Sequence, residues 1–396
     1  MNRVEEIAAV PAVRTALSTF ESDLKSVVDL AIAIQQIPSP TFHEGERAAC
    51  VKELFKRKKL ERVEEDELHN VYGLYPGNGE GQPTVISAHL DTVFSPDVDL
   101  TVRFEGPNSD IRRVYGPGLA DNSLGVAGLV MLAQTLHNNN LFTESDIWLV
   151  ANVCEEGLGD LRGMRAVVER FGSDAAYIVV EGGSFGLVFH EAIGVNRFLI
   201  EVQTPGGHSW GDFGKPNAIH VLSKLVTQIS DIEVPTEPKT TFNVGVIEGG
   251  TTINTVASHA KCQVDLRSAE KELLDKLTNE VRRLAEEAND QPNVQISMRQ
   301  IGERPSGRLA LKTPIVQMAA QALETAGSVP AEFLAGSTDA NVPISLGISS
   351  VCIGLAKSGN THRTDEFIDT TMLPKGLGQL LLLTLASAGY DEDRAG

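Results

Sequence analysis

The stretch Asp146-Ile-Trp-Leu-Val-Ala-Asn-Val-Cys-Glu-Glu-Gly157 joins an apolar run to two consecutive acids and a glycine. Adjacent carboxylates at the end of a buried strand are unfavourable unless they meet cations or protons. Because successive strand residues point to opposite sides, we expect Glu155 and Glu156 to have different tasks. The pattern favours a buried strand that ends in a polar site, although a solvated loop pair is the plainer interpretation.

Apolar runs alternate with helical patterns around this stretch. Residues 83–88 and 175–180 are predicted strands, and residues 125–136 and 159–171 are predicted helices. Such β-α-β-α order predicts an α/β fold with a mainly parallel sheet flanked by helices. In that architecture, sites form at the carboxyl ends of the strands.

The rhythm of the chain changes near residue 191. From there the pattern predicts the order β-α-β-β-α-β, which is that of a ferredoxin-like α+β unit inserted into the larger domain. A length of 396 residues also favours two domains. We therefore expect one domain from residues 1–191 and 308–396, and an inserted domain from residues 192–307.

Potential metal ligands follow five of the apolar runs. Two imidazoles and three carboxylates have the right number and softness to hold a pair of divalent ions such as zinc, which indicates metal-assisted hydrolysis. The five residues are His89, Asp121, Glu156, Glu181 and His362.

Each candidate has a plainer alternative. Asp91 could orient His89 towards a metal through its Nδ1–H group, or form a structural hydrogen bond. Asp121 could bridge two ions about 3.5–4 Å apart, but Asp is also preferred as a helix N-cap. A lone loop histidine such as His362 is usually a surface residue. No single motif decides between these readings, but their combination favours the metal site.

Composition excludes several classes of function. The net charge of −19, from 34 basic and 53 acidic residues, argues against nucleic-acid and anionic-membrane surfaces. No segment is expected to span a membrane, and the N-terminus lacks the apolar core of a secretory signal. Four widely spaced cysteines favour a reducing cytoplasm, with Cys154 as a core thiol rather than a nucleophile.

Taken together, the motifs resemble the co-catalytic zinc exopeptidase family that includes carboxypeptidase G, peptidase T, aminoacylase-1 and succinyl-diaminopimelate desuccinylase. The marks are His-x-Asp, Gly-x-Gly-x-x-Asp, Glu-Glu, a strand-end acid, and a C-terminal His with a nearby Asp-Glu. All five occur in order, and the resemblance runs from about residue 22 to residue 390.

The resemblance implies a fold of the zinc exopeptidase type and two zinc ions, which cobalt or manganese could replace. It implies one ion on His89, Asp121 and Glu181, and the other on Asp121, Glu156 and His362. Asp91 would orient His89, and the Asp121–Asn122 peptide would be cis. Glu155 would be the general base that takes a proton from a metal-bridging water and later protonates the leaving amine.

The inserted unit resembles the family's dimerisation (lid) domain, and this implies a homodimer. His208 matches a histidine that reaches the partner subunit's site, and Asn254 and Arg267 match residues that bind a substrate carboxylate. On sequence alone these are a turn histidine, a turn asparagine and a surface arginine. Ser337 and Thr338 match a loop near the substrate, and we expect a helix capped at Ser337.

We therefore expect a cytoplasmic, homodimeric metallo-exopeptidase that hydrolyses a terminal amide bond of small peptides. Glu at position 181 slightly favours cleavage next to a free carboxylate. The alternative is a deacylase of N-acyl or N-succinyl amino acids with the same chemistry. A silent binding protein would have lost a ligand or Glu155, and none is missing. Nucleotide binding is disfavoured because a third glycine and a P-loop lysine are absent.

Overall fold

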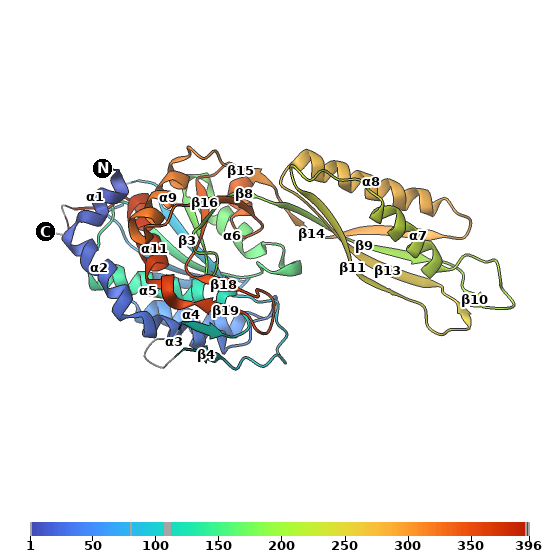
Figure 1. The fold of residues 1–396 in the computed structure, drawn as a ribbon, viewed down its shortest axis with the longest axis horizontal. Helices are drawn as coiled ribbons and strands as arrows, with labels where there is room; N and C mark the ends of the chain where they lie inside the picture. Colours follow the sequence, from blue (N-terminus) through green and yellow to red (C-terminus); the bar gives the residue numbers. More distant parts are fainter. Residues whose placement is uncertain (1, 80, 107–111, 393, 395–396) are drawn as a thin grey trace. The chain divides into compact units, whose positions relative to one another are not determined.

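A central sheet with four parallel strands organises the first of two units into which the chain divides (Figure 1). The computed structural model describes residues 2–79, 81–106, 112–392 and 394. Unit 1 comprises Met1–Glu191 and Arg308–Gly396, and unit 2 comprises Ala192–Gly307.

The parallel strands of unit 1 are almost entirely buried, which explains why their sequences are apolar throughout rather than alternating. In sheet order they are β6 (Ile147–Asn152), β3 (Thr84–His89), β7 (Ala176–Glu181) and β17 (Ser350–Gly354). Further strands extend both edges of the sheet: β1 (Glu61–Glu65), β2 (Val71–Tyr75), β8 (Leu187–Ala192), β15 (Gly307–Arg308) and β16 (Glu332–Gly336). The predicted α/β fold with a mainly parallel sheet is confirmed.

Helices flank this sheet in unit 1. They are α1 (Arg3–Ala9), α2 (Pro11–Ser22), α3 (Leu24–Gln35), α4 (Gly45–Arg57), α5 (Leu124–Asn138), α6 (Arg162–Phe171), α9 (Pro314–Gly327), α10 (Asn341–Ser345) and α11 (Leu373–Ala388). Helices such as α2 and α6 bury one apolar face, whereas α5 and α11 are buried on nearly every side.

One helical stretch of the described chain, Leu119–Asn138, has the length and apolarity needed to cross a membrane. No segment of this apolar length was recognised from the sequence, and on that point of length the expectation is wrong. Because 89% of the apolar window is buried within unit 1, the stretch serves as a core helix here.

A small second sheet in unit 1 contains β4 (Arg103–Glu105), β5 (Arg113–Tyr115), β18 (Lys357–Gly359) and β19 (Phe367–Asp369). β18 and β19 form an antiparallel hairpin, and β19 also pairs with β5. The loop of this hairpin, residues 360–366, carries His362.

Unit 2 contains a four-stranded antiparallel sheet in the order β11-β13-β9-β14. In chain order, the strands of this sheet and the two helices of unit 2 are β9 (Gly194–Gln203), α7 (Ala218–Ser230), β11 (Thr240–Gly249), β13 (His259–Ser268), α8 (Lys271–Asn289) and β14 (Gln295–Arg304). Apolar residues of both helices and of the alternating strands form one core. The chain order and strand order are those of a ferredoxin-like unit.

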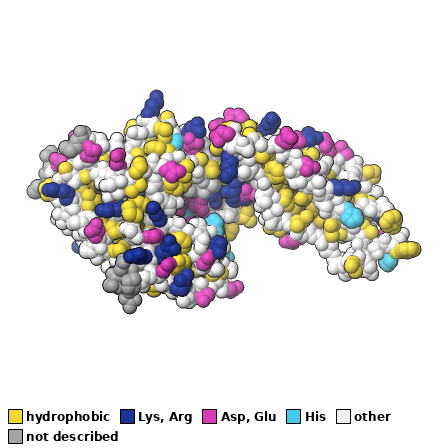
Figure 2. All heavy atoms as spheres, in the orientation of Figure 1, with side chains coloured by type: hydrophobic (Ala, Val, Ile, Leu, Met, Phe, Trp, Pro, Cys, Tyr) yellow, Lys and Arg dark blue, Asp and Glu magenta, His cyan; other side chains and the backbone are white. Residues whose placement is uncertain are grey.

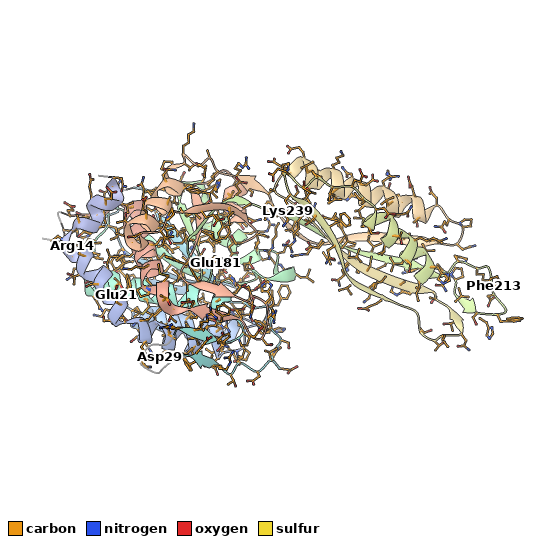
Figure 3. The ribbon with its side chains drawn as sticks, in the orientation of Figure 1. Arg14, Glu21, Asp29, Glu181, Phe213 and Lys239 are labelled. Atoms are coloured by element: carbon orange, nitrogen blue, oxygen red, sulfur yellow. The ribbon has the colours of Figure 1, made fainter. Side chains whose placement is uncertain are left out.

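One end of unit 2 carries the short paired strands β10 (Gly207–His208) and β12 (Thr255–Val256). Large apolar side chains are fully exposed on the loops beside them: Trp210, Phe213 and Ile253 are 88%, 91% and 103% exposed. Figure 2 shows apolar side chains at this end, and Phe213 is labelled there in Figure 3. Exposure of this extent is typical of a contact surface.

Candidate metal centre

His89 and Glu181 meet because they end neighbouring parallel strands, β3 and β7, in the same register. The His89 side chain is 1% exposed, and its Nε2 lies 3.7 Å from Glu181 Oε2 and 2.9 Å from Asp121 Oδ1. The Glu181 side chain, labelled in Figure 3, is 14% exposed. These three residues form the first ligand group.

The second ligand group comprises Asp121, Glu156 and His362. Nε2 of His362 lies 3.1 Å from Asp121 Oδ2 and 3.1 Å from Glu156 Oε1. Within each group, the possible ligand atoms all lie within 4.8 Å of one another. Asp121 directs one carboxylate oxygen to each group, which is the arrangement that a bridging ligand requires.

The loop that carries Asp121 is fixed by backbone and side-chain hydrogen bonds. Asn122 donates from Nδ2 to the Val180 carbonyl at 2.8 Å, and its Oδ1 accepts from the Gly182 N–H at 2.8 Å. The Asp121–Asn122 peptide is cis, as the resemblance implied. The N-cap position of α5 belongs to Ser123, so the alternative of Asp121 as an N-cap is excluded.

Asp91 is fully buried beneath both groups. Its carbonyl oxygen lies 3.0 Å from His89 Nδ1, whereas the carboxylate oxygen expected in this position lies farther away, at 3.6 Å. The carboxylate instead accepts the backbone N–H groups of Glu155 and Glu156, each at 2.9 Å, and the Thr41 hydroxyl at 2.9 Å. Asp91 therefore connects the strand end at His89 with the acid pair.

The two acids after β6 are both buried, with Glu155 6% and Glu156 5% exposed. Glu156 contacts His362, whereas Glu155 belongs to neither ligand group. This division agrees with the expectation that the two acids have different tasks. The plainer interpretation, a solvated loop pair, does not hold.

Cys154 precedes the acid pair and is 5% exposed. Its Sγ lies 3.5 Å from the buried carboxylate of Glu44. Burial raises the pKa of the Cys154 thiol to about 12, and Glu44 and Asp91 add to the rise. The thiol is therefore protonated at neutral pH and is not a nucleophile.

The electrostatics of the two groups are those of a site for cations. Burial raises the pKa of Glu156 to about 8 and that of Glu181 to about 7. Burial opposes the charged form of His89, but its carboxylate neighbours, Asp121 first, raise its pKa above the ordinary value. Hydrogen bonds with Asp121 and Glu156 raise the pKa of His362 to about 10. The buried acids therefore need positive charge close to them to be stable in the ionised form. The two imidazoles supply that charge only while they are protonated.

The donor set fits a pair of divalent cations. Two imidazole nitrogens and three carboxylates converge in two groups, and the shared carboxylate is split between them. A mixed N/O donor set of this kind suits zinc, cobalt or manganese.

Two buried acids near the site stand in motifs noted in the sequence, but neither was assigned a role there. Glu366, which is 0% exposed, accepts the N–H groups of Ala120 at 2.7 Å and Asp121 at 3.1 Å with Oε1. Asp339, also 0% exposed, accepts from Asn152 Nδ2 at 2.6 Å. Burial raises the pKa of Asp339 well above its ordinary value, and the charge of Glu155 adds to the rise. In the sequence, Glu366 is marked only as the second acid of the Asp-Glu pair that follows His362.

The expected substrate-binding residues lie in several places. Ser337 and Thr338 follow β16 in unit 1. The helix expected to be capped at Ser337 begins instead at Asn341, because the Thr338 hydroxyl accepts the Ala340 N–H at 3.2 Å and makes a turn first. The predicted cap is therefore wrong.

His208 and Asn254 lie side by side at one end of unit 2, where the Ser209 N–H donates to the Asn254 carbonyl at 3.0 Å. Arg267 lies near the opposite end of β13, which Lys239 marks in Figure 3. At about 3.3 Å per residue, the eight steps from His259 to Arg267 span about 26 Å. One copy of unit 2 therefore does not bring His208 and Arg267 together.

Arg267 already has a carboxylate partner within unit 2. Its Nε lies 2.6 Å from Asp265 Oδ1, and Arg197 Nε lies 2.9 Å from Asp265 Oδ2. Together, the two arginines and Asp265 carry a net positive charge, so the two guanidinium groups can still attract an anion.

Comparison with known proteins adds relatives of low identity. A Schizosaccharomyces pombe protein described as containing a peptidase M20 domain is 28% identical over 209 residues, 51% of this chain and 48% of that protein. An Aspergillus flavus protein named as a probable carboxypeptidase is 25% identical over 289 residues, 64% of this chain and 67% of that protein. The match thus spans about half the length of the first relative and about two thirds of the length of the second.

Solved structures share the fold. A tripeptidase from Staphylococcus aureus has a TM-score of 0.76 and 19% identity, covering 92% of this chain and 98% of that chain. A dinuclear metal-binding peptidase of the M20 family from Bacillus subtilis has a TM-score of 0.68 and 16% identity, covering 94% and 100%.

The family profile described as Peptidase family M20/M25/M40 matches residues 85–385, which is most of the chain. The matched range contains both ligand groups and all of unit 2. The chain belongs to the peptidase family M20/M25/M40.

Proposed function

We propose that the protein is a metal-dependent exopeptidase that hydrolyses a terminal amide bond of di- or tripeptides or other small peptides. One observation carries the proposal: two ligand groups share the carboxylate of Asp121, and a buried acid in neither group, Glu155, adjoins them. Membership of a peptidase family and the carboxypeptidase and tripeptidase names of its relatives and structural neighbours support the same reaction.

Two divalent cations, which we propose to be zinc, would be held by the two groups. His89, Asp121 and Glu181 would hold one, and Asp121, Glu156 and His362 the other. When bound, the cations would polarise the scissile carbonyl and lower the pKa of a water molecule.

Glu155 is the proposed general base. It accepts a proton from the attacking water and returns it to the leaving amine, so its carboxylate must face the reacting atoms while its backbone stays fixed. Asp91 holds the backbone N–H groups of both Glu155 and Glu156 at 2.9 Å, which fixes the base relative to a ligand of the second group.

Unit 2 is the proposed dimerisation (lid) domain, and residues 1–191 with 308–396 are the proposed catalytic domain. In a homodimer, His208 and Asn254 of one subunit would act in the partner subunit's site, and Ser337 and Thr338 would contact the substrate from the catalytic domain. The separation of His208 from Arg267 along unit 2 supports this assignment, because one copy alone does not assemble all five substrate residues. The exposed apolar end of unit 2 supports an oligomer.

Arg267 would bind the free carboxylate of the substrate, a task that suits a planar guanidinium. We expect the protein in the cytoplasm, since all four cysteines are unpaired.

The test is an assay of the purified protein, loaded with zinc, on dipeptides and tripeptides in parallel with N-acetyl and N-succinyl amino acids. We expect turnover of the peptides, with loss of activity when a chelator removes the metal. Turnover confined to the acylated amino acids would replace the peptidase assignment with that of a deacylase.

A further inference from the structure

Of the five proposed ligands, His362 lies in the hairpin loop of the small second sheet of unit 1. Its side chain is 52% exposed, and its backbone has φ +65°, a left-handed conformation that residues other than glycine rarely adopt. Hydrogen bonds within the hairpin loop 360–366 fold the loop on itself: the Arg363 N–H donates to the Asn360 carbonyl, and Asn360 Nδ2 donates to Asp365 Oδ2. These contacts shape the loop but do not fasten it to the other ligands.

Glu366 makes that connection. Its carboxylate accepts the N–H groups of Ala120 and Asp121, and its carbonyl oxygen accepts the N–H of Gly116 at 2.8 Å. The backbone N–H of His362 also forms a hydrogen bond with this carboxylate. One buried residue thus holds the loop of His362 against the loop of Asp121 by its main chain and by its side chain.

We propose that Glu366 is a positioning residue that fastens the His362 loop to the Asp121 loop and thereby assembles the second cation position. The inference rests on the proposed metal centre and goes beyond it, because it assigns the two cation positions different structural supports.

The first position does not depend on this contact to the same degree. His89 and Glu181 end strands of the central sheet, and Asp121 remains held through Asn122, which bonds to Val180 and Gly182. Removal of the Glu366 carboxylate should therefore leave the first group in place and release the His362 loop. Loss of a residue that orients a ligand typically weakens metal binding by about 10–100-fold.

The experiment titrates zinc into the metal-free full-length protein by calorimetry and measures bound zinc by mass spectrometry after gel filtration. Parent protein, Glu366→Ala, Glu366→Gln and Asp365→Ala are compared. Asp365 lies in the same loop and holds Arg363 and Asn360, but has no described contact with Ala120 or Asp121, so its variant controls for disturbance of the loop.

We expect the parent and Asp365→Ala to bind two ions. Glu366→Ala should bind one ion with nearly parental affinity and the second about 10–100-fold more weakly. Glu366→Gln should restore most of the second affinity, because its amide oxygen can accept the same two N–H groups. Equal binding by Glu366→Ala and the parent, or an equal loss at both positions, would overturn the proposal.

If Glu366→Ala does not fold, Glu366→Gln and Glu366→Asp carry the test. The Asp side chain is one methylene too short to reach both N–H groups, so it should loosen the second ion while Gln does not. Indistinguishable behaviour of Gln and Asp would overturn the proposal. Failure of the parent protein to bind a second ion would instead contradict the proposed two-metal centre.

Discussion

The two ligand groups share one carboxylate but are built in different ways. His89 is 1% exposed at the end of a buried parallel strand, and its neighbour Glu181 ends the adjoining strand. His362 is 52% exposed in a hairpin loop with a left-handed backbone, and it meets Glu156 across 206 residues of sequence. The central sheet thus fixes the first group, whereas the second group depends on how a loop is attached to that sheet.

Replacement of the shared ligand should erase the difference between the groups. Asp121→Ala removes a donor from both, so we expect both cations to be lost. Turnover should fall by more than about 10⁴-fold, because the cations and the setting in which Glu155 acts are lost together. Metal analysis after dialysis and initial rates check this. Retention of one tightly bound cation would show that the groups do not share Asp121.

Replacement of the proposed base should leave both groups intact. Glu155→Gln preserves the size of the side chain and removes its ability to accept a proton. We expect both cations to remain and kcat to fall by about 10²–10⁴-fold. The metal content of the variant is its own control. Unchanged kcat would exclude Glu155 as the base.

Replacement of His89 and replacement of His362 should have different effects on stability and on metal binding. His89→Ala leaves buried acids without their partner, so we expect the metal-free protein to lose about 3–5 kcal/mol of unfolding free energy. His362→Ala should loosen only the second cation, with a small change in stability because the side chain is half exposed. Chemical denaturation and zinc titration measure both effects. Equal destabilisation by the two variants would contradict the contrast between a strand-built and a loop-built group.

The smallest effect should come from a contact beneath both groups. The Thr41 hydroxyl donates to the Asp91 carboxylate, which in turn holds Glu155 and Glu156. Thr41→Val keeps the shape and removes one hydrogen bond, worth about 1 kcal/mol, or about a fivefold loss of kcat/KM. Thr143→Val, which removes a buried hydroxyl bond to the Ser145 carbonyl and none to a proposed ligand, is the matched control. A larger effect from Thr143→Val would indicate general destabilisation.

The sequence predicts the centre of the fold well. Fully apolar runs such as 85–88 and 147–151 identify buried parallel strands, and their polar ends identify His89 and the acid pair. Edge strands are harder, because β1 (Glu61–Glu65) is charged and half exposed and so carries no apolar signal. The first two helices, α1 and α2, were also not predicted.

Contacts between distant residues set the limit for the site. The positions of His89 and Glu181 follow from strand order. The groups that they form with Asp121, Glu156 and His362 agree with the expected ligand sets, although their role stays a prediction. Two other contacts depend on tertiary packing that no local pattern encodes. The Asp91 carboxylate accepts two backbone N–H groups, and Glu366 accepts an N–H group of a loop 246 residues away.

Because the Asp121 carboxylate is divided between two imidazoles, the binding of two cations would be coupled. If the two groups hold cations, the group built on the central sheet would fill first, and the charge bound there would weaken binding of a second cation to the group that shares Asp121. At limiting metal, a half-loaded species should therefore accumulate, and activity should lag behind total metal uptake.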